Sequence, residues 1–276
     1  TGDDMGVAIE HDVRSAWLAE RKTGIGSSDA AAVLGLNPYR TALEVYLDKV
    51  WLADDIEDTE AMEVGREIEP VLRRLYEKRT GLTLQGPPPL MRHSQHTFML
   101  ANLDDMREDG RIVELKNVGI RMAHLWGDEG TDSIPELYIC QVQHQMAVAG
   151  SDVADVVALI GGQNLKIFTV QRNDRFIEQM ISIEADFWRR VVNLDPPEPD
   201  WKHPQVLRAV ESLIGDPTDA SISLPASMLE VVEKFRESKG RKKEAEADEK
   251  LLKAQIEFAM GNAGKATIGR FTLTRK

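Results

Sequence analysis

The sequence contains little cysteine, no long apolar run and no excess of positive charge. Its one cysteine, Cys140, excludes an internal disulfide framework and a cysteine-type zinc site, and it is typical of a reducing cytosol. No apolar run approaches the roughly 20 residues that a membrane-spanning helix needs. The N-terminal residues also do not resemble a signal peptide. We therefore expect a cytoplasmic protein with no membrane partner.

The charge balance argues against one class of nucleic-acid-binding protein. The 276 residues include 46 acidic and 34 basic side chains, which gives a net charge of −12. This is a poor match for a protein that binds DNA through a general basic surface, because such binding depends on many Lys and Arg contacts to phosphates. A local basic channel is still compatible with this balance, because carboxylates in a site and on the outer surface also count.

Helical segments flank a strand-rich middle of the chain, and the fold that we expect is α/β. The 42% hydrophobic content is enough for one substantial core and an appendage. The proline-rich segment 195–199 is the clearest boundary. We expect a core over residues 1–198 and a mainly helical extension over 199–276, with a break or bend near 239–241. The expected helices cover residues 10–20, 28–36, 41–51, 60–79, 136–149, 174–194 and 228–260, and the expected strands cover 97–103, 111–117, 153–160, 165–171 and 271–274.

The most informative stretch runs from Asp104 to Lys116. Glu114 and Lys116 are two residues apart, so on a strand both side chains leave the same face. Asp104 follows the strand-like run 97–103, and if that run pairs with the strand of Glu114, the three side chains meet at one end of a sheet. Two carboxylates form a hard-oxygen site of the kind that Mg²⁺ takes, and a lysine beside them can hold a water or steady a developing anion. The alternative is a solvated charge pair on an ordinary sheet.

A loop rich in glycine and serine, residues 21–29, leads into a helix. Such a loop presents backbone N–H groups and a partial positive charge, which suits a phosphate. Arg21 adds a planar cation and Ser28 a hydroxyl. The alternative is an N-capped helix that follows a flexible turn. The sequence Gly-x-x-x-x-Gly-Lys-Ser/Thr is absent, which argues against an ATP-type phosphate loop.

Two helices carry further polar candidates. Glu69, in helix 60–79, could reach the carboxylate site and complete a metal shell, or it could pair with Arg73 one turn later. Gln141, in helix 136–149, could orient a water or contact a phosphate. His144 lies in the same helix, and we expect either a surface histidine or a hydrogen-bonded one there rather than a metal ligand.

Together these segments resemble the YqaJ-type viral recombinase and phage lambda exonuclease family, over roughly Trp17 to Pro197. The resemblance implies a restriction-endonuclease-like core, a central mixed sheet flanked by helices, to which the C-terminal helical extension is added. It implies Mg²⁺-dependent digestion of one strand of linear double-stranded DNA, 5′ to 3′, with Mn²⁺ able to substitute. It also implies a phage or prophage protein, a single-strand annealing partner protein and, in several members, a homotrimeric ring. The segments that carry the resemblance are residues 21–31, 65–70, 104 with 114–116, and 138 with 141–143.

The resemblance also implies a role for each matching residue. Asp104 and Glu114 would bind the catalytic metal ions together with the Leu115 carbonyl, and Lys116 would position the attacking water. Glycine often follows the metal-binding aspartate in the family, whereas Asp105 stands here, so the choice between the two aspartates stays open, with the spacing to Glu114 favouring Asp104. The remaining implied roles are metal support through water for Glu69, contact with the reaction centre for Gln141, and DNA or phosphate binding for Arg21, Ser28 and Tyr138.

Two other functions are compatible with the same residues. In one, the carboxylates and the lysine form a structural charge cluster, and the chain is a non-catalytic interaction module. Helix 228–260 favours this hypothesis, because a long charged helix with a thin apolar stripe often pairs with another helix. In the other, the protein is a repair nuclease of the same fold that cuts DNA internally.

Overall fold

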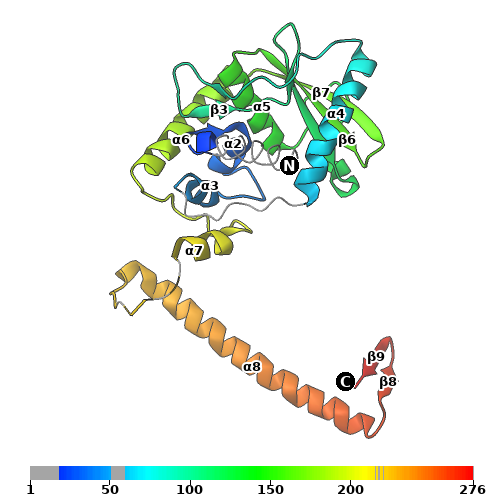
Figure 1. The fold of residues 1–276 in the computed structure, drawn as a ribbon. Helices are drawn as coiled ribbons and strands as arrows, with labels where there is room; N and C mark the ends of the chain where they lie inside the picture. The colour runs from blue at the N-terminus through cyan, green and yellow to red at the C-terminus, as the bar shows by residue number, and fades with distance from the viewer. Residues whose placement is uncertain (1–18, 51–59, 215, 217, 220, 276) are drawn as a thin grey trace, which may run out of the picture. The chain divides into compact units, whose positions relative to one another are not determined.

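The computed structural model describes residues 19–50, 60–214, 216, 218–219 and 221–275 (Figure 1). The chain forms two compact units, Thr1–Asp216 and Pro217–Lys276. Most of the expected helix 10–20 lies outside the described residues. None of the described helices is both long enough and apolar enough to cross a membrane.

A mixed four-stranded sheet forms the centre of the first unit. Its two middle strands run parallel, with Glu114 opposite Val156, and each outer strand is antiparallel to its neighbour. The inner strand Val153–Ile160 is buried at every position after the first. Its nearly continuous apolar sequence fits a strand covered on both faces. In spatial order the strands are β4 (Asp105–Met106), β5 (Ile112–Val118), β6 (Val153–Ile160) and β7 (Asn164–Gln171).

A second, three-stranded sheet corrects one expectation. The run 97–103 was expected to pair with 111–117, but its strand, β3, lies in the small sheet instead. The reason is close backbone contact: the Ile25 N–H donates to the Phe98 carbonyl at 2.6 Å, and a Cβ on Gly24 would lie only 2.5 Å from that oxygen. A glycine thus lets β1 approach β3. The strands of this sheet, in order, are β1 (Ile25–Gly26), β3 (Met99–Ala101) and β2 (Met91–Arg92).

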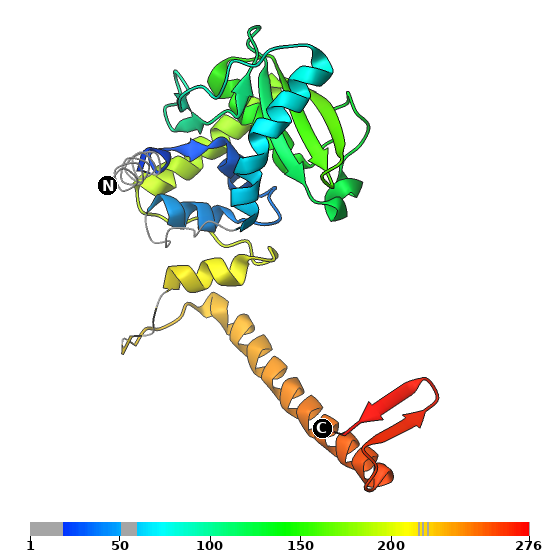
Figure 2. The ribbon, with the colours of Figure 1, turned by 45° about the vertical axis from the view of Figure 1, so that its right-hand side comes forward.

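Helices cover the two faces of the four-stranded sheet, and the cyan helix α4 (Glu60–Thr80) lies across one of them (Figure 2). Leu72 and Tyr76 of α4 pack on Val113 and Leu115. The other face packs on α5 (Glu136–Ala149) and on α6 (Asp174–Val192), with α2 (Ser27–Val33) beside them. Residues of β5 therefore alternate between the two helical layers, so Glu114 and Lys116 face α5.

A further apolar cluster moves the expected domain boundary. The helices α3 (Ala42–Lys49) and α7 (Val206–Ile214) pack together, and Ala209 of α7 is buried among residues of α2, α3 and α6. The first unit therefore extends to Asp216 rather than ending at 198, because α7 completes this cluster. A short 3₁₀ helix, η1 (Ile120–Leu125), follows β5.

The second unit consists of a short 3₁₀ helix, one long helix and a hairpin. The 3₁₀ helix η2 (Ala226–Met228) leads into α8 (Leu229–Met260), which runs without a break through the region 239–241. The hairpin pairs β8 (Lys265–Ile268) with β9 (Phe271–Thr274). The extension is therefore mainly helical, but it ends in a two-stranded hairpin of which only the strand 271–274 was expected.

Candidate functional site

Asp104, Glu114 and Lys116 lie together at the edge of β5. Asp104 follows β3, and its Oδ2 accepts a hydrogen bond from the Leu115 N–H at 2.8 Å. Glu114 is buried, and its Oε1 forms an ion pair with Lys116 Nζ. The expected cluster therefore exists, although it forms beside the hairpin of β4 and β5 and not through pairing of β3 with β5.

The two neighbouring aspartates have different surroundings. Asp105 is fully buried, and its Oδ1 accepts from the Gly86 and Met106 N–H groups, each at 2.8 Å. Its carboxylate also pairs with Arg73. Asp105 is therefore fixed by main-chain groups and a cation of the fold, while Asp104 is the aspartate that shares a cavity with Glu114. The structure thus favours Asp104 as the candidate ligand.

Two glutamines of α5 hold the Glu114 carboxylate. Gln141 Nε2 donates to Oε1 at 2.6 Å, and Gln145 Nε2 donates to Oε2 at 2.6 Å. Gln145 is fully buried and was not among the expected site residues. Its position four residues after Gln141, which places both on one helix face, is the signal that could have identified it. These contacts orient both oxygens of Glu114.

With both carboxylates ionised, the cluster would have more negative charge than its lysine offsets. Burial raises the pKa of Asp104, and the charge of Glu114 raises it further, to about 8, against the opposing effect of Lys116. Burial by itself lowers the pKa of Lys116, but the charges of Glu114 and Asp104 outweigh it, so that pKa lies above its ordinary value. Lys116 is therefore protonated at neutral pH, and a further cation at Asp104 would be electrostatically favourable.

The loop 21–29 and the carboxylates line one cavity. It has a volume of about 220 Å³, and Arg21, Ser28, Lys116 and Gln141 belong to its walls together with Asp104 and Glu114. The structure thus brings together these expected site residues from segments that lie far apart in the sequence.

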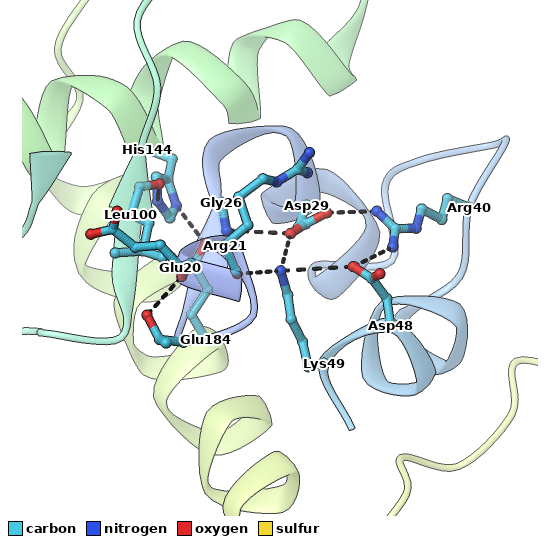
Figure 3. A network of polar contacts seen from close by, with 11 residues as sticks. Glu20, Arg21, Gly26, Asp29, Arg40, Asp48, Lys49, Leu100, His144 and Glu184 are labelled. Carbon is cyan, nitrogen blue, oxygen red and sulfur yellow. Dashed lines mark hydrogen bonds and ion pairs between the residues drawn. The ribbon is translucent and has the colours of Figure 1, made fainter. Parts of the chain in front are cut away.

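A buried network fixes the backbone at the edge of this cavity (Figure 3). Asp29 of α2 is fully buried and pairs with Arg40 at 2.6 Å and with Lys49 at 2.8 Å. Lys49 Nζ also donates to the Arg21 carbonyl at 3.1 Å. Burial raises the pKa of Asp29, but the charges of Lys49, Arg40 and Arg21 outweigh it and hold that pKa well below its usual range. Sequence reasoning did not identify Lys49, because nothing local marks a lysine as buried.

Glu69, Tyr138 and His144 lie around the cavity but do not line it. Glu69 lines a neighbouring groove of about 580 Å³ with Leu115 and Lys116, and burial and the charge of Glu114 raise its pKa. Arg73, the alternative partner expected for Glu69, pairs with Asp105 instead.

Tyr138 packs on the catalytic candidate Lys116, whose Nζ lies 5.1 Å from the centroid of the ring. His144 is fully buried, with Nδ1 2.9 Å from Glu184 and Nε2 3.0 Å from the Leu100 carbonyl (Figure 3). It is therefore a hydrogen-bonded histidine of the core, as expected.

The oxygen atoms at the cluster suit a hard divalent cation. Among the described residues, no group of three or more His, Cys, Asp or Glu side chains could hold a metal ion. The available donors are therefore the carboxylates of Asp104 and Glu114 and the carbonyl of Leu115. The N–H and C=O of one strand residue point to the same edge, so this carbonyl lies on the side of Asp104. Carboxylate and carbonyl oxygens are the preferred ligands of Mg²⁺, and the residues present fit that ion.

Comparison with known proteins identifies the family. The family described as the YqaJ-like viral recombinase domain matches residues 16–152. The uncharacterized protein YqaJ of Bacillus subtilis (strain 168) is 31% identical over 263 residues, which cover 94% of this chain and 82% of YqaJ. The chain belongs to the YqaJ-like viral recombinase family. The matched domain contains every residue of the cluster and both glutamines that hold Glu114. The uncharacterized protein R354 of Acanthamoeba polyphaga mimivirus is 25% identical over 150 residues, which are 50% of this chain and 27% of R354.

Solved structures show the same fold. The alkaline exonuclease LHK-Exo of Laribacter hongkongensis matches with a TM-score of 0.53 and 19% identity, over 73% of this chain and 100% of that one. LHK-Exo in complex with dAMP matches with a TM-score of 0.51 and 22% identity, over 65% and 95% of the two chains. The expected α/β fold with a restriction-endonuclease-like core is thus confirmed.

Proposed function

We propose that this member of the YqaJ-like family is a Mg²⁺-dependent exonuclease that digests one strand of linear duplex DNA from 5′ to 3′. It would leave 3′ single-stranded tails for single-strand-annealing recombination. The observation that carries the proposal is the single cavity that combines two carboxylates and a lysine with Arg21 and Ser28. The alkaline exonuclease activity named for LHK-Exo, which has the same fold, supports it.

Asp104, Glu114 and the Leu115 carbonyl would hold the metal ions, with Glu69 supporting them through water from the neighbouring groove. When bound, such ions supply Lewis-acid stabilisation of charge on phosphate oxygens. Mn²⁺ would substitute for Mg²⁺, since both accept oxygen ligands.

Lys116 would orient the attacking water and offset the negative charge that develops on the phosphate. Its protonated state and its ion pair with Glu114 place a fixed cation at the cavity before the substrate arrives. Gln141, which is already hydrogen-bonded to Glu114, would contact the same centre.

Arg21 and Ser28 would bind a phosphate of the DNA, the one at the 5′ end, with Tyr138 contacting the strand nearby. A guanidinium and a hydroxyl are suited to phosphate oxygens. Because the positive charge is needed only along this cavity, the net charge of −12 is compatible with DNA binding. We extend the proposal to a homo-oligomer, such as a trimeric ring, with a single-strand annealing protein as partner in the bacterial cytoplasm.

Digestion of end-labelled DNA tests the proposal. With Mg²⁺, the protein should release label from the 5′ end of linear duplex DNA and leave closed circular DNA intact. Substrates with a 5′-phosphate should be preferred over those with a 5′-hydroxyl, and Ca²⁺ should support binding without digestion. Asp104→Asn should abolish release, whereas Asp186→Asn, at an exposed ion pair on α6, should retain it.

Two outcomes would favour the other hypotheses. Cutting of closed circular DNA would indicate a repair-type nuclease that cuts internally. Binding without any metal-dependent digestion would indicate a non-catalytic module.

A further inference from the structure

A second hollow adjoins the candidate active site. It has a volume of about 620 Å³ and lies between the turn that follows α2, the end of β5 with η1, and the start of α5. We call it the apolar pocket. The side chains that characterise it are the aromatic rings of Tyr39, Trp126 and Tyr138 and the polar groups of Asn117, Glu136 and His203.

The apolar pocket lies beside the cluster, because residues of its wall contact or adjoin residues of the cluster. Tyr138 is one wall of the pocket, and the Nζ of Lys116 lies 5.1 Å from the centroid of its ring. Asn117 follows Lys116 on β5, about 3.3 Å further along the strand. On α5, Tyr138 lies about one helical turn before Gln141, which lines the catalytic cavity. A ligand bound at the cluster therefore has the apolar pocket as its immediate neighbour.

The composition of the pocket does not suit a phosphate. Among the described residues that line it, none is Lys or Arg, and Glu136 is acidic. His203 is already engaged, since its Nε2 lies 2.8 Å from the Asn37 carbonyl. Aromatic walls with an amide at one side suit a planar, neutral heteroaromatic group.

Tyr39 has the features of a stacking platform. The residue is 59% exposed, while its N–H donates to Asn37 Oδ1 at 2.8 Å, which fixes the main chain of the turn. Trp126, also in the lining, is buried against Tyr138, with ring centroids 5.4 Å apart. The pocket thus combines one accessible ring with a rigid aromatic wall.

We propose that the apolar pocket binds one unstacked nucleobase of the DNA strand whose phosphate lies in the cavity of Asp104 and Glu114. This inference rests on the proposed function and adds a subsite for the base. A base that leaves the duplex loses its stacking partners, and Tyr39 restores that stacking. Because every base has an aromatic face, the subsite accepts bases without sequence preference.

Substitution of Tyr39 tests this subsite through the substrate's KM. Tyr39→Ala should raise the KM for duplex ends by about 5- to 150-fold, the range that loss of one base–aromatic stack gives, and Tyr39→Phe should restore it. A substrate without a base at the first nucleotides should bind the native protein more weakly. Removal of the base should have little further effect on how strongly the Tyr39→Ala variant binds the substrate. Leu207→Ala, at an exposed position on α7, serves as control and should retain the native KM.

A binding measurement separates this inference from the proposed function. With Ca²⁺ present, 2-aminopurine near the 5′ end should change its fluorescence on binding the native protein, and this change should be absent with Tyr39→Ala. Native activity with an unchanged KM for Tyr39→Ala would overturn the subsite alone. If the native protein digests no DNA, the proposed function fails, while a Tyr39-dependent fluorescence change would still support the subsite. A native protein that shows neither activity nor a fluorescence change would contradict both.

Discussion

Replacement of Asp29 by asparagine tests whether the buried network stabilises the first unit. Asp29 is fully buried between Arg40 at 2.6 Å and Lys49 at 2.8 Å, and Lys49 itself is 1% exposed. Asparagine and aspartate have nearly the same shape, so the substitution removes the charge while it keeps the volume of the side chain. It leaves the Lys49 ammonium buried beside a neutral group, with the Arg21 carbonyl at 3.1 Å and the more distant Asp48 carboxylate at 3.9 Å as its remaining partners.

The expected loss of unfolding free energy follows from that burial. Removing one partner of a buried ion pair costs about 3–5 kcal/mol, because the other charge stays uncompensated. The total unfolding free energy of a native domain is about 5–15 kcal/mol, so this loss should leave the variant close to the limit at which it still folds. Lys49→Met should cost less, since Arg40 still pairs with Asp29. The double variant should cost less than the sum of the two single variants.

Urea unfolding monitored by tryptophan fluorescence measures these costs. The matched control is Asp186→Asn, because Asp186 pairs with Arg189 at 2.6 Å while both side chains are more than half exposed. The control should change the unfolding free energy far less than Asp29→Asn does, because an exposed ion pair contributes little to stability. An Asp29→Asn cost as small as the control's, or strictly additive single variants, would refute the reasoning.

The pH dependence gives an independent check of the same network. The pKa of Asp29 is lowered from 3.8 in the folded protein, so the unfolded chain binds its proton first as the pH falls. The stabilisation is therefore complete above about pH 4 and is lost below it. The difference in unfolding free energy between the native protein and Asp29→Asn should become smaller as the pH falls from about 4 toward about 2. A difference that stays constant over this range would contradict the stabilising role of the Asp29 charge.

Other substitutions and metal addition give further predictions. Since the pKa of Asp104 is raised from 3.8 to about 8, the folded state keeps a proton that the unfolded chain loses. Metal-free protein should therefore lose stability as the pH rises between these values, and Asp104→Asn should remove that loss. Asp105→Asn should instead lower the unfolding free energy by about 1–3 kcal/mol, because it removes the buried charge that accepts hydrogen bonds from the Gly86 and Met106 N–H groups and pairs with Arg73. Mg²⁺ should raise the unfolding temperature of the native protein in a calorimetric scan but not that of Asp104→Asn. Tyr76→Phe removes a hydrogen bond of 2.7 Å to buried Asp155 and should cost about 1–3 kcal/mol in urea unfolding.

Much of the regular structure could be predicted from local patterns. Helix 136–149 and the hairpin 153–171 were expected within a residue or so of their observed bounds, because their apolar periodicity is long and uninterrupted. The two-residue strands β1, β2 and β4 could not be found in this way, because strands that short carry no periodicity. The pairing of β1 with β3 depends on Gly24 and on a backbone contact more than 70 residues away in sequence.

The sequence predicted several residues of the candidate site, but it did not predict the contacts that hold these residues in place. The spacing of Glu114 and Lys116 placed them on one face, and their contact with Asp104 follows from the turn before β4. The choice between Asp104 and Asp105 needed Gly86 and Arg73, which lie elsewhere in the sequence. The buried role of Lys49 depends on neighbours from other elements, for which the local sequence carries no signal.

Anomalous diffraction from crystals soaked in Mn²⁺ tests the central claim most directly. We expect a manganese peak in contact with the carboxylates of Asp104 and Glu114 and the carbonyl of Leu115, and no such peak in Asp104→Asn. A fully active protein whose crystals show manganese elsewhere, with no peak at these oxygens, would contradict the account.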